Sequence, residues 1–465
     1  MPSRQDQLHS YQYSLQRVVA ALVTHDPDPS RSPLRRAGTT ALVSLLIASL
    51  AVGGAAVYGR LTGHSNVDPK NADVVFQEKG TGARFVYLES DARLHPVLNF
   101  ASGLLLANSD APELKSISSD KLATVPLGAT LGIPDAPDSL PAKNALLTER
   151  WSICTDNQGD ESSPRSTLLI GDKLTDGTVA ATAAEALLVR EPQGRNSLIF
   201  NNRRYPIPAD RLVATLRVLG WASKEPWTVS SAWANTVPLA ASLIAPKVPD
   251  DAGATSAVEG FKVGDLVTDS GNQFAMILAD GIADVTPLQA KLLQVVPGIE
   301  EPRPIGNQFI GLPQSKTRLS DPNNPDGLPP TVPKLHDATP TRACMTLPVD
   351  PKSGDGLRID PTVPSGVAVE AGNTPANVQL ADFVHIARGK GVLASAAASP
   401  TAPADSGTVT IVTDTGRSFP LANRSLQSKF GYAGVKPAQI PSELVSLLPR
   451  GPSLDPARAR QTDVQ

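Results

Sequence analysis

The longest run of apolar positions extends from Ala37 to Gly59 and contains no charged residue. About 20 such residues form a helix that crosses the ~30 Å hydrocarbon layer of a membrane. No other stretch is comparable, so the pattern predicts one transmembrane helix over residues 37–59. A cleaved signal peptide is the alternative. The segment before the run is long, and the run exceeds the usual h-region of about 7–15 residues, so an anchor is favoured.

The orientation of this predicted span follows from the basic residues on either side of it. Several arginines precede it and only Arg60 follows it at once; the preceding ones are Arg4, Arg17, Arg31, Arg35 and Arg36. Basic residues collect on the cytoplasmic side of a span. We therefore expect residues 1–36 in the cytoplasm and the remaining chain outside the inner (cytoplasmic) membrane.

A seam of apolar residues at helical spacing lies before the span. Its members recur at steps of three and four: Leu8, Tyr11, Leu15, Val18 and Leu22. This spacing predicts a helix over residues 4–24, which Asp26-Pro27-Asp28-Pro29 ends. A helix of two heptads is marginal alone. We expect it to pack on another subunit or on the membrane surface.

Beyond the span, one pattern recurs four times: a strand, a polar turn, a second strand, then an aromatic or polar residue before proline. The copies are Gly82–Leu98, Ser197–Pro208, Gly271–Leu288 and Val409–Leu421. Each precedes a helix-compatible segment, at 99–107, 209–219, 288–296 and 441–448. A hairpin with one short helix cannot bury its own apolar face, so such units are expected to stack on each other or on a shared core.

Proline-rich segments separate these units. Residues 298–341 are the clearest, and they are predicted to be a linker. A calcium loop around Asp321 and Asp326 is rejected, because Pro325 occupies a ligand position and no glutamate follows at the required distance. Residues 396–407 are predicted to be a flexible loop and residues 451–465 a polar tail.

Composition narrows the class of protein. There are 43 prolines in 465 residues, nearly twice the average of about 5%. The 42 basic and 45 acidic residues leave a net charge of −3, so no basic field is available to bind nucleic acid. Both cysteines, Cys154 and Cys344, lie in the exported part. In an oxidising compartment they indicate one disulfide; two free buried thiols are the alternative.

The sequence contains little that suggests catalysis. It has no G-x-x-x-x-G-K-[ST] phosphate loop, no G-x-S-x-G elbow and no metal-binding spacing of cysteine and histidine. We therefore predict no catalytic, cofactor-binding or metal-binding residues. His95 is interpreted as a structural residue at a strand end. His385 is placed on the strand face opposite Phe383.

Two further groups have a structural and a functional interpretation. The four tryptophans could line a ligand groove but are more typical of core residues; they are Trp151, Trp221, Trp227 and Trp233. The run from Asn202 to Tyr205, which includes Arg203 and Arg204, could contact an anionic envelope polymer. A solvated turn is the favoured interpretation.

Several strings in collinear order resemble the EccB family, the B component of the type VII (ESX) secretion membrane complex. The longest is TGARFVYLESDARLHPVLNFASGLLL at residues 81–106. The others are GIPDAP (132–137), WSIC (151–154), VPSG (363–366), VTDTGRSFPL (412–421), FGYAGVKP (430–437) and SLLPRGPSLDPARAR (446–460). The cytoplasmic start is similar too, with Gln7, Tyr11 and Arg17 in matching positions. The resemblance covers nearly the whole chain.

This resemblance implies an α+β protein in which one N-terminal transmembrane helix precedes an elongated extracytoplasmic region. That region would hold a β-rich central domain, bridged by Cys154–Cys344, and four small α/β repeat domains. The expected divisions are 1–36 (cytoplasmic helix and linker), 37–59 (span), 66–120 (repeat 1), 121–160 and 342–400 (central), 161–220 (repeat 2), 221–297 (repeat 3), 298–341 (linker), 401–450 (repeat 4) and 451–465 (tail).

The resemblance also implies a function and a set of partners. The chain would be a core structural subunit that organises the extracytoplasmic face of the secretion complex. Its partners would be the EccC ATPase, EccD, EccE, the mycosin protease and further copies of itself. ATP hydrolysis has been attributed to some family members, so an ATPase with an unconventional site is one alternative. A repeat protein that binds envelope polymer is the other.

Overall fold

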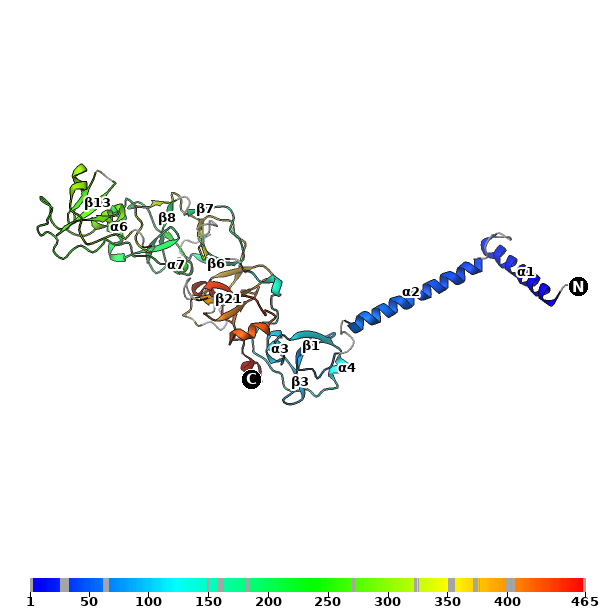
Figure 1. Cartoon of the computed structure of the whole chain (residues 1–465). Coiled ribbons are helices and arrows are strands. Elements are labelled where there is room, and N and C mark those ends of the chain that lie inside the picture. The colour runs from blue at the N-terminus through cyan, green and yellow to red at the C-terminus, as the bar shows by residue number, and fades with distance from the viewer. Residues whose placement is uncertain are drawn as a thin grey trace. The chain divides into compact units, whose positions relative to one another are not determined.

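The computed structural model of the chain is an α+β structure with one long apolar helix near the N-terminus and a β-rich remainder (Figure 1). This confirms the predicted fold class. It describes residues 3–25, 33–61, 67–148, 150–157, 163–180, 184–269, 272–321, 324, 326–349, 356–370, 375, 377–397, 403 and 406–462. Two compact units are present, and each is described by itself: Met1–Asn71 with Phe76–Ala83 and Leu114–Pro126, and the rest of the chain.

The first unit contains both N-terminal helices. Helix α1 (Arg4–Thr24) begins at Ser3, whose hydroxyl accepts the N–H of Asp6 while the Asp6 carboxylate accepts the N–H of Ser3. This reciprocal pair satisfies free N–H donors at the start of the helix. The helix covers residues 4–24, as the sequence predicted. Helix α2 (Pro33–Leu61) contains the predicted span. Helix α4 (Ser119–Leu122) also belongs to this unit, whereas β1 (Val74–Glu78) and β4 (Glu113–Ile117) have residues in both units. The predicted stop at residues 26–29 lies outside the described residues.

The four predicted hairpins are confirmed. They are β2–β3 (Arg84–Leu88, Arg93–Pro96), β9–β10 (Asn196–Phe200, Arg203–Ile207), β13–β14 (Phe274–Leu278, Gly281–Val285) and β22–β23 (Val409–Val412, Ser418–Pro420). A short helix follows each hairpin, as predicted: α3 (Phe100–Leu106), α6 (Leu212–Val218, after the 3₁₀ turn η2, Ala209–Arg211), α8 (Pro287–Leu293) and α9 (Ser442–Val445), the last preceded by η4 (Arg424–Ser428).

All four hairpins belong to sheets with the same strand order. In the sheets of repeats 2, 3 and 4, a first strand pairs antiparallel with the hairpin and parallel with a fourth strand. The first and fourth strands are β8 (Glu185–Arg190) with β11 (Trp227–Thr228), β12 (Leu266–Thr268) with β15 (Arg303–Pro304), and β21 (Val392–Ala397) with β24 (Ala438–Pro441). The repeats seen in the sequence are therefore repeats of topology.

A seven-stranded sheet is formed by two segments of the chain, one between repeats 1 and 2 and the other between repeats 3 and 4. Its order is β19-β20-β6-β5-β17-β18-β7. The strands are β5 (Trp151–Asp156), β6 (Arg165–Ile170), β7 (Thr178–Val179), β17 (Arg342–Leu347), β18 (Leu357–Ile359), β19 (Val367–Ala368) and β20 (Phe383–Ile386). The strands come from two distant parts of the sequence. The 3₁₀ turn η1 (Lys143–Ala145) precedes β5.

Sheet membership moves several of the predicted boundaries. Strands β6 and β7 lie in the central sheet and not in repeat 2, while β21 begins repeat 4 instead of ending the central domain. The predicted linker contributes β15 and η3 (Gly306–Gly311) beside β12, and β16 (Lys334–Leu335) pairs with β8. The prolines of this segment interrupt the strand pattern in the sequence, but they do not prevent strand pairings of two residues. The division into domains itself stays a prediction.

Shared apolar cores join successive parts of the second unit. One core combines the central sheet with β8, α7 (Ser231–Thr236), β24 and α9, and it includes Trp151, Val189, Trp233 and Leu444. A second joins repeat 1 to repeat 4, and a third joins α8 to the sheet of repeat 2. Burying apolar area across such joints resists their separation.

The predicted polar tail is instead packed. Leu454 is fully buried, its N–H donates to Pro420 O at 2.8 Å, and α10 (Pro456–Ala459) buries Ala459 in the core shared by repeats 1 and 4. Because the tail sequence is mostly polar, it did not predict the burial of Leu454 and Ala459. The predicted flexible loop at 396–407 lies largely outside the described residues.

Tyr432 offers a test of that shared core. Its hydroxyl donates to Pro141 O at 2.8 Å, the residue is 1% exposed, and burial raises the pKa of the phenol. Tyr432→Phe leaves a buried carbonyl without this donor, so we expect the free energy of unfolding to fall by about 1–2 kcal/mol. Chemical denaturation measures it. Tyr87→Phe is the control, because no partner of that hydroxyl occurs in the described part of the chain; equal losses in both variants would contradict the assignment.

Candidate functional site

The apolar helix α2 is the first candidate, because its side chains have no cover. The segment Gly38–Gly59 has a mean hydropathy of 2.1, and none of its most apolar window is buried. At ~1.5 Å per residue its 22 residues span about 33 Å, which matches the hydrocarbon layer. An exposed helix of this length and composition is suited to a membrane.

A charge in the middle of α2 tests this anchor. Leu46, which is 60% exposed, would lie near the bilayer centre, where lysine in place of leucine costs about 3 kcal/mol of insertion free energy. We expect Leu46→Lys to move much of the protein out of the carbonate-resistant membrane fraction. Val57→Lys is the matched control, since a lysine near the helix end can extend to the interface. Equal retention of both variants would argue against a span.

The apolar seam of α1 is the second candidate. All five of its residues are exposed by 54–76%: Leu8, Tyr11, Leu15, Val18 and Leu22. Nothing in the described part of the chain covers them. This is the arrangement expected of a helix whose partner belongs to another molecule.

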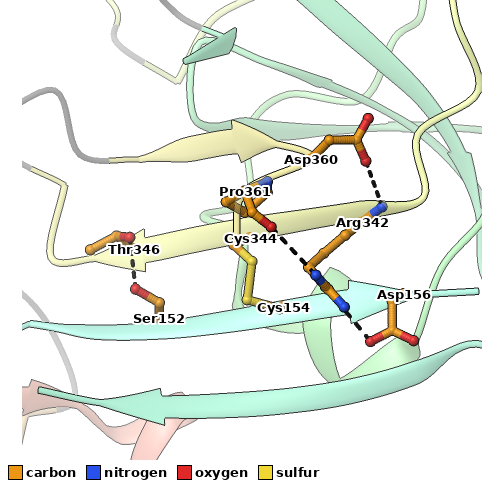
Figure 2. Close-up of a disulfide and its surroundings, with 8 residues drawn as sticks. All are labelled: Ser152, Cys154, Asp156, Arg342, Cys344, Thr346, Asp360 and Pro361. Carbon is orange, nitrogen blue, oxygen red and sulfur yellow. Dashed lines mark hydrogen bonds and ion pairs between the residues drawn. A yellow bond between two sulfur atoms is a disulfide. The ribbon is translucent and has the colours of Figure 1, made fainter. Parts of the chain in front are cut away.

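The third candidate is the cysteine pair of the central sheet. Cys154 on β5 and Cys344 on β17 are direct cross-strand neighbours, their Cα atoms are 3.9 Å apart, and their sulfurs are joined in a disulfide (Figure 2). Both residues are fully buried. No free cysteine remains.

Polar pairs flank the disulfide along the same two strands. Ser152 and Thr346 share a hydrogen bond of 2.8 Å between their hydroxyls, and Arg342 lies 3.9 Å from the Asp156 carboxylate. Asp360 accepts the backbone N–H of Arg342 at 2.9 Å, as Figure 2 shows. The pairs at 152/346, 154/344 and 156/342 are in register, so they point to one face of the sheet.

The position of the disulfide in the chain determines which segment it constrains. The chain leaves the central sheet after β7 to form repeats 2 and 3, and β17 brings it back. The sequence separation of the cysteines is 190 residues. The disulfide therefore closes the base of a long excursion that contains two repeats.

Three histidines of the second unit make structural contacts. His95 is 6% exposed and lies between Ala129 O (2.8 Å from Nδ1) and Asp91 Oδ2 (2.9 Å from Nε2), as the structural interpretation predicted. His336 Nδ1 lies 2.5 Å from Glu185 Oε2 and so ties β16 to β8. No sequence spacing signals this pair, because its members are 151 residues apart.

The predicted orientation of His385 is wrong. Along β20 the buried residues are Val384 and Ile386, while Phe383 and His385 are both only partly buried. Side chains two residues apart in a strand point to the same face. His385 therefore shares the face of Phe383, where its Nε2 lies 3.4 Å from Asp172.

The four tryptophans are core residues, with exposures between 0 and 7%; the core interpretation is confirmed. The turn at 202–205 is not a solvated one. Arg203 pairs with Asp326 at 2.6 Å, Arg204 lies 3.5 Å from the buried Glu191, and Tyr205 is buried. Asn202 Oδ1 accepts the N–H of Leu357 at 2.7 Å. Contacts distant in sequence therefore cover this segment in part.

One hollow of about 300 Å³ lies beside β20 and the β22–β23 turn. Its polar lining mixes Arg417 with Glu370 and Asp414, a charge pattern that does not favour a polyanion such as a nucleoside triphosphate. The described residues contain no group of three or more potential metal ligands.

Comparison with known proteins gives one consistent family. The model of the type VII secretion system ESX-1 transport TM domain B (EccB) matches residues 1–464. "ESX-3 secretion system ATPase EccB3" of Mycobacterium tuberculosis is 25% identical over 97% of this chain and 88% of its own length. Its namesake of Mycolicibacterium smegmatis is 28% identical over 74% of this chain and 67% of its own length.

Solved structures share the fold. An intact ESX-5 inner membrane complex contains a chain with a TM-score of 0.64 and 22% identity, over 100% of this chain and 96% of that one. The EccB3 dimer of the ESX-3 core complex gives a TM-score of 0.63 and 23% identity, over 83% and 100%.

Proposed function

The chain belongs to the EccB family of type VII (ESX) secretion proteins, and on that premise we propose that it is a core structural subunit of the secretion membrane complex. Its role is mechanical. Helix α2 anchors it in the membrane, and the repeats and central sheet organise one face of the complex for protein export. The observation that carries this proposal is an uncovered apolar helix in a chain whose β-rich modules share apolar cores with one another.

The arginines before α2 support an orientation with the N-terminus in the cytoplasm and the bulk of the chain on the far side of the inner membrane. The buried disulfide supports the same placement, because such bonds persist in oxidising compartments. A C-terminal tag should then be accessible to protease only after the outer layers are removed, with the inner membrane intact. Protection under those conditions would reverse the orientation.

The family and the solved complexes support self-association and a multiprotein assembly. We propose that the partners are the EccC ATPase, EccD, EccE and a mycosin protease. The exposed seam of α1 is the surface offered to those on the cytoplasmic side. Purification of the C-terminally tagged chain from native membranes in mild detergent tests this. A megadalton particle with an FtsK-like ATPase and a multi-span protein is expected; a lone monomer or homodimer across gentle detergents would oppose it.

The relatives are named ATPases, so ATP hydrolysis by this chain is the second candidate. We propose instead that the subunit is not itself an enzyme, because the sequence lacks a phosphate loop and the one hollow described above has a lining of mixed charge. A thermal shift of the purified chain with ATP and magnesium, together with phosphate release above a background preparation, would favour the enzyme.

The structure does not favour binding of an anionic envelope polymer. The two arginines that suggested it are paired within the chain, Arg203 with Asp326 and Arg204 with Glu191. Paired guanidinium groups offer little free charge to a polymer. Failure of the purified chain to pellet with cell-wall material is the expected result.

A further inference from the structure

Each of the four repeat hairpins has a second segment of its own chain along its outer strand. The pairings are isolated parallel bridges: Leu94 with Leu127, Arg204 with Leu239, Ile282 with Gln314, and Ser418 with Arg450. Repeats 1 and 4 each have a second such bridge, Val97 with Leu131 and Leu421 with Leu454. The outer strands are β3, β10, β14 and β23. We call the added segments edge caps: residues 127–131, 239–243, 314–315 and 450–454.

The edge caps are held by the same backbone hydrogen bonds in every repeat. The residue after each bridge donates its N–H to the outer strand: Gly128 to Leu94 O (2.9 Å), Ala240 to Arg204 O (2.9 Å), Ser315 to Ile282 O (2.8 Å) and Gly451 to Ser418 O (2.8 Å). In three repeats the strand residue donates back to a proline carbonyl, that of Pro238, Pro313 or Pro449, at 2.8–3.0 Å. A pattern that recurs in all four modules is a property of the repeat.

A second contact follows in three of the repeats. The N–H groups of Leu131, Leu243 and Leu454 donate to the carbonyls of Pro96, Pro206 and Pro420 at 2.9, 2.7 and 2.8 Å. The three leucines are 0–5% exposed, so each cap is also fixed by its side chain.

The prolines of these outer strands lie where an N–H would point outward. In repeats 1 and 4 the next residue, Val97 or Leu421, donates inward to Arg84 O or Val409 O. Because neighbouring N–H groups in a strand alternate in direction, the proline N faces the cap. Proline there removes a donor from the free edge without costing a bond inside the sheet.

In repeat 3, the residue that corresponds to the strand prolines differs from the one that the sequence pattern indicated. Its outer-strand residue equivalent to these prolines is Asp284, two positions after the bridged Ile282. Pro287, which the sequence pattern matched to them, is the first residue of α8. The edge cap is present in repeat 3 although the strand proline is not.

Uncovered edge strands offer unpaired N–H and C=O groups, and these are templates for strands of other chains. We propose that the four edge caps block strand addition at the repeat hairpins, so that copies of this protein do not extend one another's sheets at these four edges. The inference goes beyond the proposed function and does not depend on it. It also gives the proline-rich sequence a physical role.

A matched pair of substitutions in repeat 2 separates the cap bond from general effects of proline. Ala240→Pro removes the N–H that bonds to Arg204 O. Leu239→Pro is the control, because Leu239 is 59% exposed and its N–H has no acceptor within the described chain. The full-length chain in detergent is used for both. Fluorescence of Trp221, Trp227 and Trp233 reports whether the module stays folded.

The readouts are hydrogen exchange at the Arg204 amide and binding of a labelled synthetic peptide of residues 236–245. In Ala240→Pro we expect exchange to be at least about tenfold faster and the peptide to bind, while the wild type and Leu239→Pro exchange slowly and do not bind. Slow exchange in Ala240→Pro, or fast exchange without binding, would overturn the proposal. Equal binding by the wild type would do so too.

Repeat 3 provides a second, independent test if the repeat 2 variant does not fold. Ser315→Pro removes the N–H bonded to Ile282 O, and Gln314→Pro is its control. Faster exchange at Ile282 in Ser315→Pro alone, with a folded module, supports the proposal. Unfolding of both cap variants while both controls stay folded would overturn it, since the caps would then be needed for folding itself.

Discussion

Replacing both Cys154 and Cys344 by alanine is expected to lower the free energy of unfolding by as much as roughly 5 kcal/mol, because the bond closes a very long loop in the unfolded chain. The cysteines are 190 residues apart, and the loop between them contains β6, β7 and repeats 2 and 3. Guanidinium denaturation followed by tryptophan fluorescence measures the change, since Trp151 begins β5 itself.

A control on the same strands separates loop closure from local packing. Ser152→Ala with Thr346→Val removes the neighbouring cross-strand hydrogen bond of 2.8 Å and is expected to cost only about 1 kcal/mol. Both double variants disturb the same face of β5 and β17. A cysteine variant no less stable than this control would show that the loop is already constrained by other contacts.

Trp233→Ala is expected to cost about 3–5 kcal/mol, the usual range for deleting a large buried aromatic side chain. Trp233 is fully buried, and its helix α7 packs against β5, β17 and α9. The side chain therefore fills the core in which the central sheet, repeat 2 and repeat 4 meet. Because three modules share the resulting cavity, we expect them to lose stability together.

Limited proteolysis combined with denaturation measures this coupling. Val213→Ala on α6 is the control, since Val213 is 70% exposed and its truncation leaves no cavity. New cleavage sites between repeat 2 and the central sheet are expected for Trp233→Ala alone. Unfolding of repeat 2 with repeat 4 unaffected would contradict a common core.

Local patterns predicted local structure well. The span, the helix over residues 4–24 and the four hairpins each depend on a periodicity within about 20 residues, which the sequence displays directly. The membership of β7 in the central sheet depends instead on pairing with β18, about 180 residues away. Strand β6 pairs with its neighbour β5 as well as with the distant β20, and the pattern of side chains in β6 does not show whether it belongs to that sheet or to repeat 2.

The contacts that were missed are short and involve the backbone. Strand β16 has two residues, and the edge caps form isolated bridges through backbone N–H and C=O groups, which all residue types except proline possess. The packed tail depends on one leucine, Leu454, in an otherwise polar segment. The sequence pattern predicts such features poorly, because each depends on a few positions whose contacts are determined by the rest of the fold.

The out-and-back path through the central sheet also sets an order in time. Strand β5 is made long before β17, its partner in the sheet and in the disulfide. At synthesis rates of about 5–20 residues per second, the 190-residue separation corresponds to roughly 10–40 s. During that interval Cys154 has no native partner while repeats 2 and 3 are being made, so these two repeats are able to fold before the central sheet is complete.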